Sequence, residues 1–491
     1  MQASRRGVIG GLFASVGAAA LGGCAGTNPA TGRSSFTGLY GIEDDKKLGA
    51  QEHPKMLEAF GGEYPDPKLQ AYVDQIGKRV AQHAEFTQFD YRFFLLDSPI
   101  VNAFALPGGY CYVSRGLLAL ASDEAELAGV IAHEVGHVNA RHTAERLTSA
   151  TIAQLGLAVL GIATGSQAVT DLGGMAAGAY IQSFSREQEL EADTLGIRYM
   201  AKAGYDANAM VSFLATLRAH SMVEAQAMGL PAGSVDEFNL MATHPRGAQR
   251  VQEAVAQVKA QGLPTGGNRN RDGYLGMIDG MLYGDDPKEG KITGQLFQHR
   301  DLRLQFEAPE GFRLQNGTDR VVASRKDGAA MLFDMASRKS ANLRDYLERE
   351  WAEPGALSGI ETITINGLQA VTGSTRMQTQ GGVADIRPVV IDGGESRVFR
   401  LLFVSPTTAT ASLSEAFRRT TYSFRRLSQA EAAKILPQRI LITKASASSD
   451  PAVLGRPLPY GQYNAQAWLV LNGLGQGQRP QAGQLIKVVA S

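Results

Sequence analysis

The most constraining feature of this sequence is a short, mostly apolar run that contains one glutamate and two histidines. Residues 127–138 read LAGVIAHEVGHV, and their polar side chains are His133, Glu134 and His137. Apolar residues recur at helical spacing on the remaining face and predict a stripe that packs in the core. Because buried polar groups without partners are costly, the run predicts a buried helix whose polar face has a specific task.

The spacing of the two histidines indicates a metal site. Residues four apart on a helix lie on one face, so His133 and His137 point together and can hold one Zn²⁺. Glu134 lies beside them and can reach a metal-bound water without being a ligand. Zinc lowers the pKa of such a water toward ~7, and a carboxylate can take its proton as it attacks a carbonyl. The alternative is a pair of hydrogen-bonded core histidines beside a solvated glutamate.

Zinc needs a third protein ligand and an open fourth position. The candidates lie in residues 185–193, SREQELEAD, which the pattern predicts to be part of a helix over 185–203. From the residues alone, Glu187, Glu189 and Glu191 remain open choices for this ligand.

Several separated motifs resemble the M48 family of zinc metallopeptidases. They are HEVGH at 133–137, SREQELEAD at 185–193, Thr-His-Pro at 243–245 with Arg250, and NAFALPGG at 102–109. The resemblance covers roughly residues 40–260. It implies that Glu189 is the third zinc ligand and that Asp193 hydrogen-bonds a zinc histidine and fixes its tautomer. Glu187 and Glu191 are then solvated helix charges or members of local ion pairs, and His142, rotated off the ligand face, is structural.

Two further residues have weaker assignments. His244 precedes Pro245, a favourable first helical position, so it could simply cap a helix. Its functional alternative is to face the site, where it would stabilise an oxyanion or fill the open zinc position. Arg250 would bind a carboxylate near the metal, or else form a surface ion pair.

The segment 103–113 is expected to hold the substrate as an added strand on an exposed sheet edge. Ala105 would lie on this edge, and Gly108 and Gly109 would keep it open to a peptide. The alternative is an ordinary hairpin turn.

The first residues resemble an export signal. Arg5 and Arg6 precede a weakly apolar run to Gly23, so we expect a signal peptide over 1–23. The end of the run, LGGC, resembles a bacterial lipobox, which implies lipidation of Cys24 and a membrane anchor. Residues 24–36 would be the lipidated N-terminus and its tether. By resemblance to Gram-negative lipoproteins, the protein would lie in the periplasm, anchored to the outer membrane. Cys111 is then the remaining thiol, expected in a strand.

The expected fold class is α+β. A mainly helical peptidase domain with a small sheet (37–264) would be followed by a linker (265–294), an antiparallel-sheet accessory domain (295–430) and a LysM-like segment (436–491). Within the first domain the pattern predicts helices over 67–82, 123–147, 207–218 and 245–261, strands over 89–97 and 109–114, and a buried helical hairpin over 151–183. In the accessory domain it predicts strands over 302–308, 320–324, 330–335, 361–365, 370–376 and 398–404 and helices over 342–351 and 413–422.

Charge and motifs together give the expected function. The chain has 48 basic and 48 acidic residues, which argues against a nucleic-acid partner. We expect a zinc endopeptidase, with one Zn²⁺ per chain, that cleaves unfolded or misassembled envelope proteins. The alternatives are a chaperone-like lipoprotein with a largely closed metal site, and a protein that binds peptidoglycan through its C-terminal segment.

Overall fold

The computed structural model describes residues 26–35, 40–148, 184–227, 266–317, 319–379, 382–394 and 396–491, with single positions at 229, 253, 256, 257 and 259–262. The signal peptide, Cys24, the expected hairpin over 151–183, His244, Arg250 and most of the expected helix over 245–261 lie outside these residues. The chain forms two compact units. Unit 1 contains residues up to 281 together with 440–456 and 462–488, and unit 2 contains 282–439, 457–461 and 489–491.

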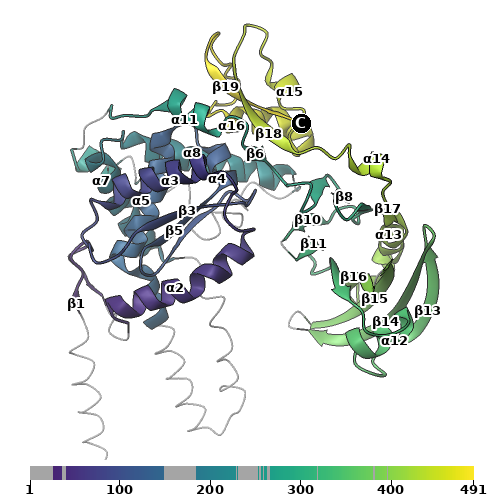
Figure 1. Cartoon of the computed structure of the whole chain (residues 1–491). Helices are drawn as coiled ribbons and strands as arrows, with labels where there is room; N and C mark the ends of the chain where they lie inside the picture. The colour runs from purple at the N-terminus through teal and green to yellow at the C-terminus, as the bar shows by residue number, and fades with distance from the viewer. Residues whose placement is uncertain are drawn as a thin grey trace, which may run out of the picture. The chain divides into compact units, whose positions relative to one another are not determined.

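A three-stranded sheet lies at the centre of unit 1 (Figure 1). Its strand order is β3-β5-β4, in which β5 pairs parallel to β3 and antiparallel to β4. Helix α2 covers one face, where the His53 ring lies 4.5 Å from the ring of Phe94. Helices α3 and α5 cover the other face, where Gly77 of α3 lies against the ring of Phe93. The bounds are β3 Arg92–Leu96, β4 Ala103–Leu106, β5 Tyr110–Ser114, α2 Ile42–Ala59, α3 Pro67–Ala81 and α5 Glu124–Ala140.

Helix α5 contains the HEVGH residues and begins where the sequence predicts. The Asp123 side chain accepts a hydrogen bond from the Glu126 amide at 2.9 Å and so caps the helix. The helix ends at Ala140 rather than near residue 147. Arg141 adopts a left-handed conformation with φ of 59°, held by hydrogen bonds to the Asp45 carboxylate and the Tyr40 carbonyl. A separate helical turn follows over 142–148.

The stretch expected to form a linker is divided: residues 266–281 belong to unit 1, and residues 282–294 belong to unit 2. Arg269 contacts the carboxylates of Asp123 at 2.7 Å and Asp206 at 3.3 Å. Helix α11 follows (Arg271–Ile278), and its Tyr274 is fully buried. The division between the units falls at residues 281–282, within the stretch 265–294, and Arg269 before it binds the acidic N-terminus of α5. Unit 1 also includes helices α4 Arg115–Leu120, α7 Arg186–Lys202 and α8 Asn208–Ala227.

The expected N-terminal tether is partly folded. Residues 26–35 form a hairpin of β1 (Gly26–Thr27) and β2 (Ser34–Ser35). Its Asn28 is buried and donates a hydrogen bond to the Asn139 carbonyl at the end of α5. Arg198 of α7 donates to the Ala30 carbonyl on the opposite side of the turn. These contacts attach the hairpin to the two helices that carry the HEVGH and ELEAD motifs.

The C-terminal segment also packs on the peptidase half of the chain. It consists of β18 Gln438–Lys444, α15 Pro451–Leu454, a 3₁₀ turn at Gly461–Tyr463, α16 Asn464–Leu471 and β19 Leu485–Ala490. Lys487 is buried, and its Nζ donates to the carbonyls of Ala119, Leu120 and Ala121 at the end of α4. This lysine satisfies carbonyls that the end of a helix leaves without intrahelical partners.

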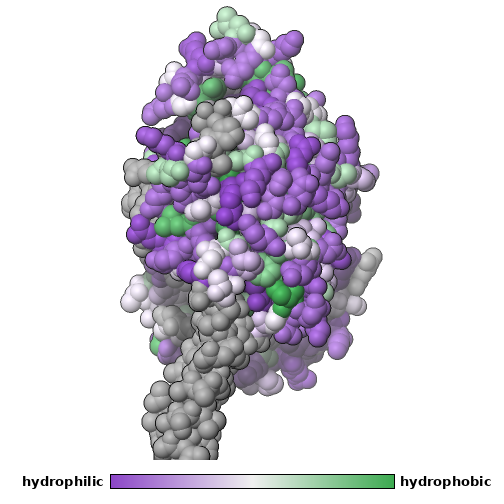
Figure 2. Space-filling view, turned by 90° about the vertical axis from the view of Figure 1, so that its left-hand side faces the viewer, coloured by the Kyte–Doolittle hydropathy of each residue, from purple (hydrophilic) through white to green (hydrophobic). Residues whose placement is uncertain are grey.

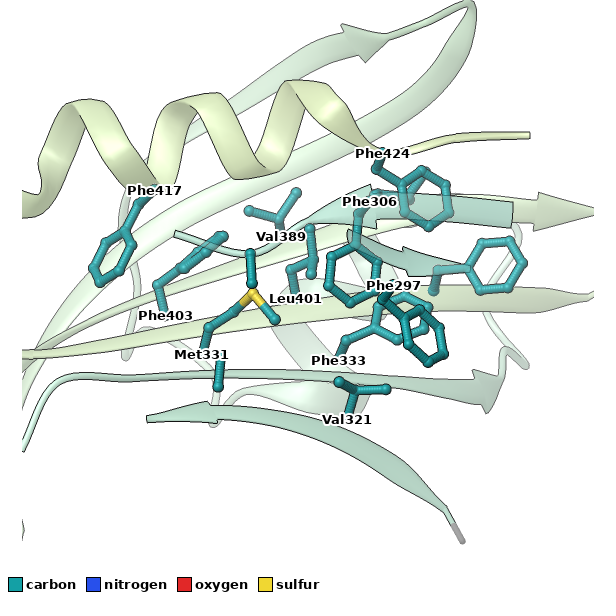
Figure 3. Close-up of a cluster of buried hydrophobic side chains, with 14 of the residues drawn as sticks. Phe297, Phe306, Val321, Met331, Phe333, Val389, Leu401, Phe403, Phe417 and Phe424 are labelled. Atoms are coloured by element: carbon teal, nitrogen blue, oxygen red, sulfur yellow. The ribbon is translucent and has the colours of Figure 1, made fainter. Parts of the chain in front are cut away.

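Unit 2 is an antiparallel-sheet domain, and with it the predicted α+β class is confirmed. Its large sheet has the order β10-β11-β12-β16-β15-β14-β13. Phenylalanines from several strands and from α13 form the core shown in Figure 3. The bounds are β6 Leu282–Tyr283, β7 Lys291–Thr293, β8 Leu296–His299, β9 Leu304–Glu307, β10 Arg313–Asn316, β11 Arg320–Ser324, β12 Ala330–Ser337, α12 Leu343–Asp345, a π-helix Tyr346–Trp351, β13 Ser358–Ile365, β14 Leu368–Thr379, β15 Gly382–Gly394, β16 Arg397–Pro406, α13 Thr410–Ser423, β17 Arg425–Arg426 and α14 Gln429–Ala432.

All six strands predicted for this domain are present, but the sequence analysis missed β8, β10, β17 and the longest of the missed strands, β15. That strand contains Pro388, and proline normally argues against a central strand. In the structure Pro388 lies opposite Leu402 of β16, and the pairing of β15 with β14 skips it. Its missing N–H therefore falls at a position where the ladder with β14 is open.

The surface seen in Figure 2 is mainly hydrophilic, with hydrophobic residues in small separate groups. Scattered apolar residues of this kind are normal on folded proteins. Among the helices that the structure describes, none is both long and apolar enough to cross a lipid bilayer.

The buried Lys487 gives a prediction for stability against pH. Burial lowers the pKa of Lys487 from 10.5 to about 7, so between these values the unfolded chain binds more protons than the folded chain. The free energy of unfolding should therefore rise with pH across this window, by at most about 1.4 kcal/mol per pH unit from this group. Lys487→Met should remove that rise. Urea denaturation of both proteins at several pH values checks this, and a wild-type advantage that stays constant or shrinks with pH would contradict it.

Candidate metal centre

Helices α5 and α7 bring three potential metal ligands together. His133 Nε2 and His137 Nε2 lie 3.0 Å apart. Glu189 of α7 approaches both, with one carboxylate oxygen 3.6 Å from His133 Nε2 and the other 3.3 Å from His137 Nε2. One ligand atom from each residue lies within 4.8 Å of the others, and all three side chains are buried.

Two glycines make this close approach of the helices possible. A Cβ on Gly136 of α5 would lie 2.8 Å from the Ala192 carbonyl oxygen of α7. A Cβ on Gly196 of α7 would lie 2.9 Å from the His133 amide nitrogen of α5. Both distances are too short for a methyl group, so the two backbones pack where only glycine fits. Gly136 is thus the residue that lets the HEVGH helix meet the helix of the third ligand.

His133 is oriented by Asp193, as the family resemblance implies. Its Nδ1 lies 2.9 Å from Asp193 Oδ1. Asp193 is one helical turn after Glu189 and equally buried, so α7 presents both carboxylates on one face. A proton on His133 Nδ1 that is donated to Asp193 leaves Nε2 with its lone pair toward the cluster.

His137 is oriented through a second histidine. Its Nδ1 lies 2.8 Å from His142 Nδ1, and His142 Nε2 lies 3.0 Å from Glu191 Oε2. His142 is fully buried. Of the two roles expected for Glu191, a solvated charge or a member of a local ion pair, the structure shows the second, with contacts to His142 and Arg33. Burial raises the pKa of Glu191, but the hydrogen bond with His142 and the nearby positive charge outweigh this and hold the pKa below its ordinary value.

The donor set fits a zinc ion. Two neutral imidazole nitrogens that face each other at 3.0 Å repel unless a cation or a proton lies between them. Burial, with the neighbouring His133 and His142, holds the pKa of His137 well below its ordinary value and so favours the neutral form that a metal needs. Two histidines and one glutamate are the ligands of several catalytic zinc sites, which keep a fourth position for water or substrate.

Glu134 lies between the two histidines in sequence and is buried beside the cluster. The thiol of Cys111 is buried, and this burial raises its pKa; the negative charge of Glu134 raises that pKa further. Cys111 is in β5 and fully buried, which agrees with its expected place in a strand.

Phe184 was not found by the sequence analysis, because a lone phenylalanine carries no motif. Its ring stacks on His137 with centroids 4.0 Å apart and an interplanar angle of 26°. The Arg146 guanidinium lies 4.4 Å from the centre of the Phe184 ring. The aromatic ring thus covers one face of a candidate metal ligand.

A pocket lies between the edge strand β4 and the end of α5, and His137 is the residue of the cluster that lines it. It is lined by Ala105, Leu106, Pro107, Gly108 and His137, with Asp45, Val138, Arg141, Thr143 and Ala144. Close packing of the backbone also requires glycine at Gly108 and Gly109, the two glycines of the expected substrate edge. A Cβ on Gly108 would lie 2.7 Å from Lys46 Cα of α2, and Gly109 lies against Asp90; both have positive φ. His244 and Arg250 lie outside the described residues, so their place relative to the cluster stays a prediction.

These observations define a metallopeptidase domain of the His-Glu-x-x-His class, in which a second helix supplies a glutamate. Comparison with known proteins agrees with this class: residues 67–258 match the family model "Peptidase family M48".

Named relatives agree with this assignment. A beta-barrel assembly-enhancing protease of Yersinia pestis is 29% identical over 312 residues, covering 61% of this chain and 58% of that protein. One from Escherichia coli is 30% identical over 198 residues, covering 38% of this chain and 39% of that protein. Mitochondrial metalloendopeptidase OMA1 of Arabidopsis thaliana is 36% identical over 142 residues, covering 29% of this chain and 28% of that protein. The chain therefore spans less than two thirds of each of these relatives.

The glycine contact gives a prediction that runs against helix propensity. Alanine is favoured over glycine inside a helix by about 1 kcal/mol. Gly196→Ala should nevertheless lower zinc affinity at least about tenfold, since the added methyl group must push α7 away from His133. Gly129→Ala is the matched control, because its Cβ would meet nothing closer than 3.5 Å. Zinc affinity from chelator competition checks both, and equal affinities in the two variants would show that the contact is unimportant.

Proposed function

We propose that this protein is a zinc-dependent endopeptidase that hydrolyses peptide bonds of extended polypeptides. The observation that carries the proposal is the convergence of His133, His137 and Glu189, with Glu134 beside them on the same helix. The site would hold one zinc ion per chain, which when bound supplies a Lewis acid and lowers the pKa of a water molecule.

The residues of the chain have separate roles in this proposal. Glu134 takes a proton from the attacking water and returns it to the leaving amine, as a general base and then a general acid. Its burial removes competing solvent and strengthens its electrostatic effect on groups nearby. Asp193 holds His133 in the tautomer that leaves Nε2 free for the metal. Helix α7 thus provides both a ligand and the group that orients another ligand.

The substrate would lie along strand β4. This strand is at the edge of its sheet, since among the described strands it pairs with β5 alone, in the order β3-β5-β4. An extended peptide can add to such an edge through main-chain hydrogen bonds, which suits unfolded chains of varied sequence. Support comes from the pocket that Ala105 of this strand shares with His137. Gly108, packed against α2, and Gly109, packed against Asp90, would keep the end of this edge open to the peptide.

The proposed substrates are unfolded or misassembled envelope proteins. The names of two relatives, beta-barrel assembly-enhancing protease, support this choice of compartment and substrate class. A signal peptide over 1–23 and lipid on Cys24 would place the chain in the periplasm at the outer membrane.

A second candidate function is binding without cleavage, to unfolded proteins or to peptidoglycan. The LysM-like segment motivates the glycan alternative. Part of that segment is used for packing, since Lys487 and Trp468 are buried and Lys487 binds the end of α4. This favours a structural role for the segment. A pull-down on purified peptidoglycan with the full chain tests the alternative, and firm retention would support glycan binding.

Glu134→Gln is expected to abolish peptide cleavage while zinc stays bound, because glutamine keeps the shape of the side chain but cannot take a proton. Loss of a general base of this kind costs about 10²–10⁴-fold in rate. The measurement is casein cleavage together with zinc content of the purified protein. Bound zinc with wild-type cleavage in Glu134→Gln would exclude the proposed role, and bound zinc with no cleavage in either protein would favour the binding function.

His244→Ala separates the two functions proposed for His244. If this histidine fills the open zinc position, its loss should raise the rate of casein cleavage. If it stabilises the oxyanion, the rate should fall by about 10²-fold or more, as for other oxyanion donors. An unchanged rate would leave His244 with a helix-capping role only.

A further inference from the structure

The two histidines of the metal centre are supported in different ways. His133 contacts a carboxylate directly, whereas His137 reaches its carboxylate through the ring of His142. Both series of contacts end on helix α7: that of His133 ends at Asp193, and that of His137 ends at Glu191. The three groups His137, His142 and Glu191 are joined by contacts of 2.8 and 3.0 Å, which are hydrogen-bond distances.

Only one arrangement of protons on His137, His142 and Glu191 is compatible with metal binding by His137. If Nε2 of His137 faces the metal with its lone pair, the proton must be on Nδ1 and must be donated to Nδ1 of His142. His142 then carries its own proton on Nε2, which points at Glu191 Oε2. The carboxylate accepts it. Each neutral ring therefore has one donor and one acceptor, and both are used.

Glu191 is itself held by the N-terminal hairpin, residues 26–35. Arg33 places a guanidinium nitrogen 3.3 Å from Glu191 Oε2, and Thr31 makes a side-chain hydrogen bond to the same carboxylate. Asn28 of the hairpin is bonded to the Asn139 carbonyl near the end of α5. The hairpin thus contacts both helices of the metal centre on the side where His142 lies.

We propose that His142 and Glu191 are positioning residues for the metal, which orient His137 as Asp193 orients His133, and that the N-terminal hairpin fixes Glu191. This inference rests on the proposed function, because it requires that the cluster holds zinc. It adds to the family resemblance, which assigns neither residue such a task.

The competing explanation is that His142 merely fills space in the core. Three substitutions separate the two. His142→Phe keeps a buried ring but offers no acceptor to His137. His142→Gln offers a carbonyl acceptor to His137 and an amide donor to Glu191. Glu191→Ala removes the end of the chain. Glu145→Ala is the matched control, since Glu145 also contacts Arg33, at 3.4 Å, but lies in the helical segment 142–148 rather than on α7.

The experiment measures zinc affinity of the purified full chain by competition with a chelator, and the melting temperature of the metal-free protein. Loss of such an outer hydrogen bond typically weakens metal binding by about 10–100-fold. We expect that loss in His142→Phe and Glu191→Ala, with His142→Gln and Glu145→Ala within about threefold of wild type. Recovery of zinc affinity in His142→Gln relative to His142→Phe would not be expected of a residue that only fills space, whatever the melting temperatures of the metal-free proteins.

The outcomes are distinguishable. Wild-type affinity in both His142→Phe and Glu191→Ala would overturn the inference. If His142→Phe does not fold, Glu191→Ala decides alone. Absence of zinc from the wild-type protein would sink the proposed function, whereas zinc in the wild type that is weakened by Asp193→Ala but not by the His142 and Glu191 variants would leave that function standing and refute this inference.

Discussion

The close packing of α5 against α7 is the contact on which the rest of the site depends. Gly136 and Gly196 let the two backbones meet, and only at that separation can Glu189 reach both histidines. Helix α7 then supplies three carboxylates. Glu189 contacts both histidines of the cluster, whereas Asp193 contacts the other nitrogen of His133 and Glu191 contacts His142. Much of the surrounding structure fixes these two helices, from the cap at Asp123 to the N-terminal hairpin.

This arrangement explains why so many charged groups are buried in one small region. A buried carboxylate or imidazole is costly unless it is paired, and here Asp193 faces His133, His142 faces His137, and Glu191 faces His142. A divalent cation at the proposed site would offset the remaining electrostatic cost of burying these groups. Burial, together with His133 and His142, lowers the pKa of His137 and favours the neutral form that a metal ligand requires.

The sequence was sufficient for the features that depend on local spacing. It predicted the helix of His133 and His137, the start of that helix at residue 123 and six strands of unit 2. It could not choose among Glu187, Glu189 and Glu191 without the family resemblance, because all three lie on one helix and only tertiary packing selects one. It also placed His142 off the ligand face by assuming a continuous helix. The left-handed Arg141 breaks that helix and returns His142 to His137.

The central claim is that His133, His137 and Glu189 together hold one zinc ion. The most direct test is a crystal structure of the zinc-loaded protein with anomalous diffraction recorded on both sides of the zinc absorption edge. We predict one strong anomalous peak, bonded to Nε2 of both histidines at about 2.0–2.1 Å and to a Glu189 oxygen at about 2.0–2.2 Å. A peak at any other group of residues, or none in protein that contains zinc by elemental analysis, would contradict the account.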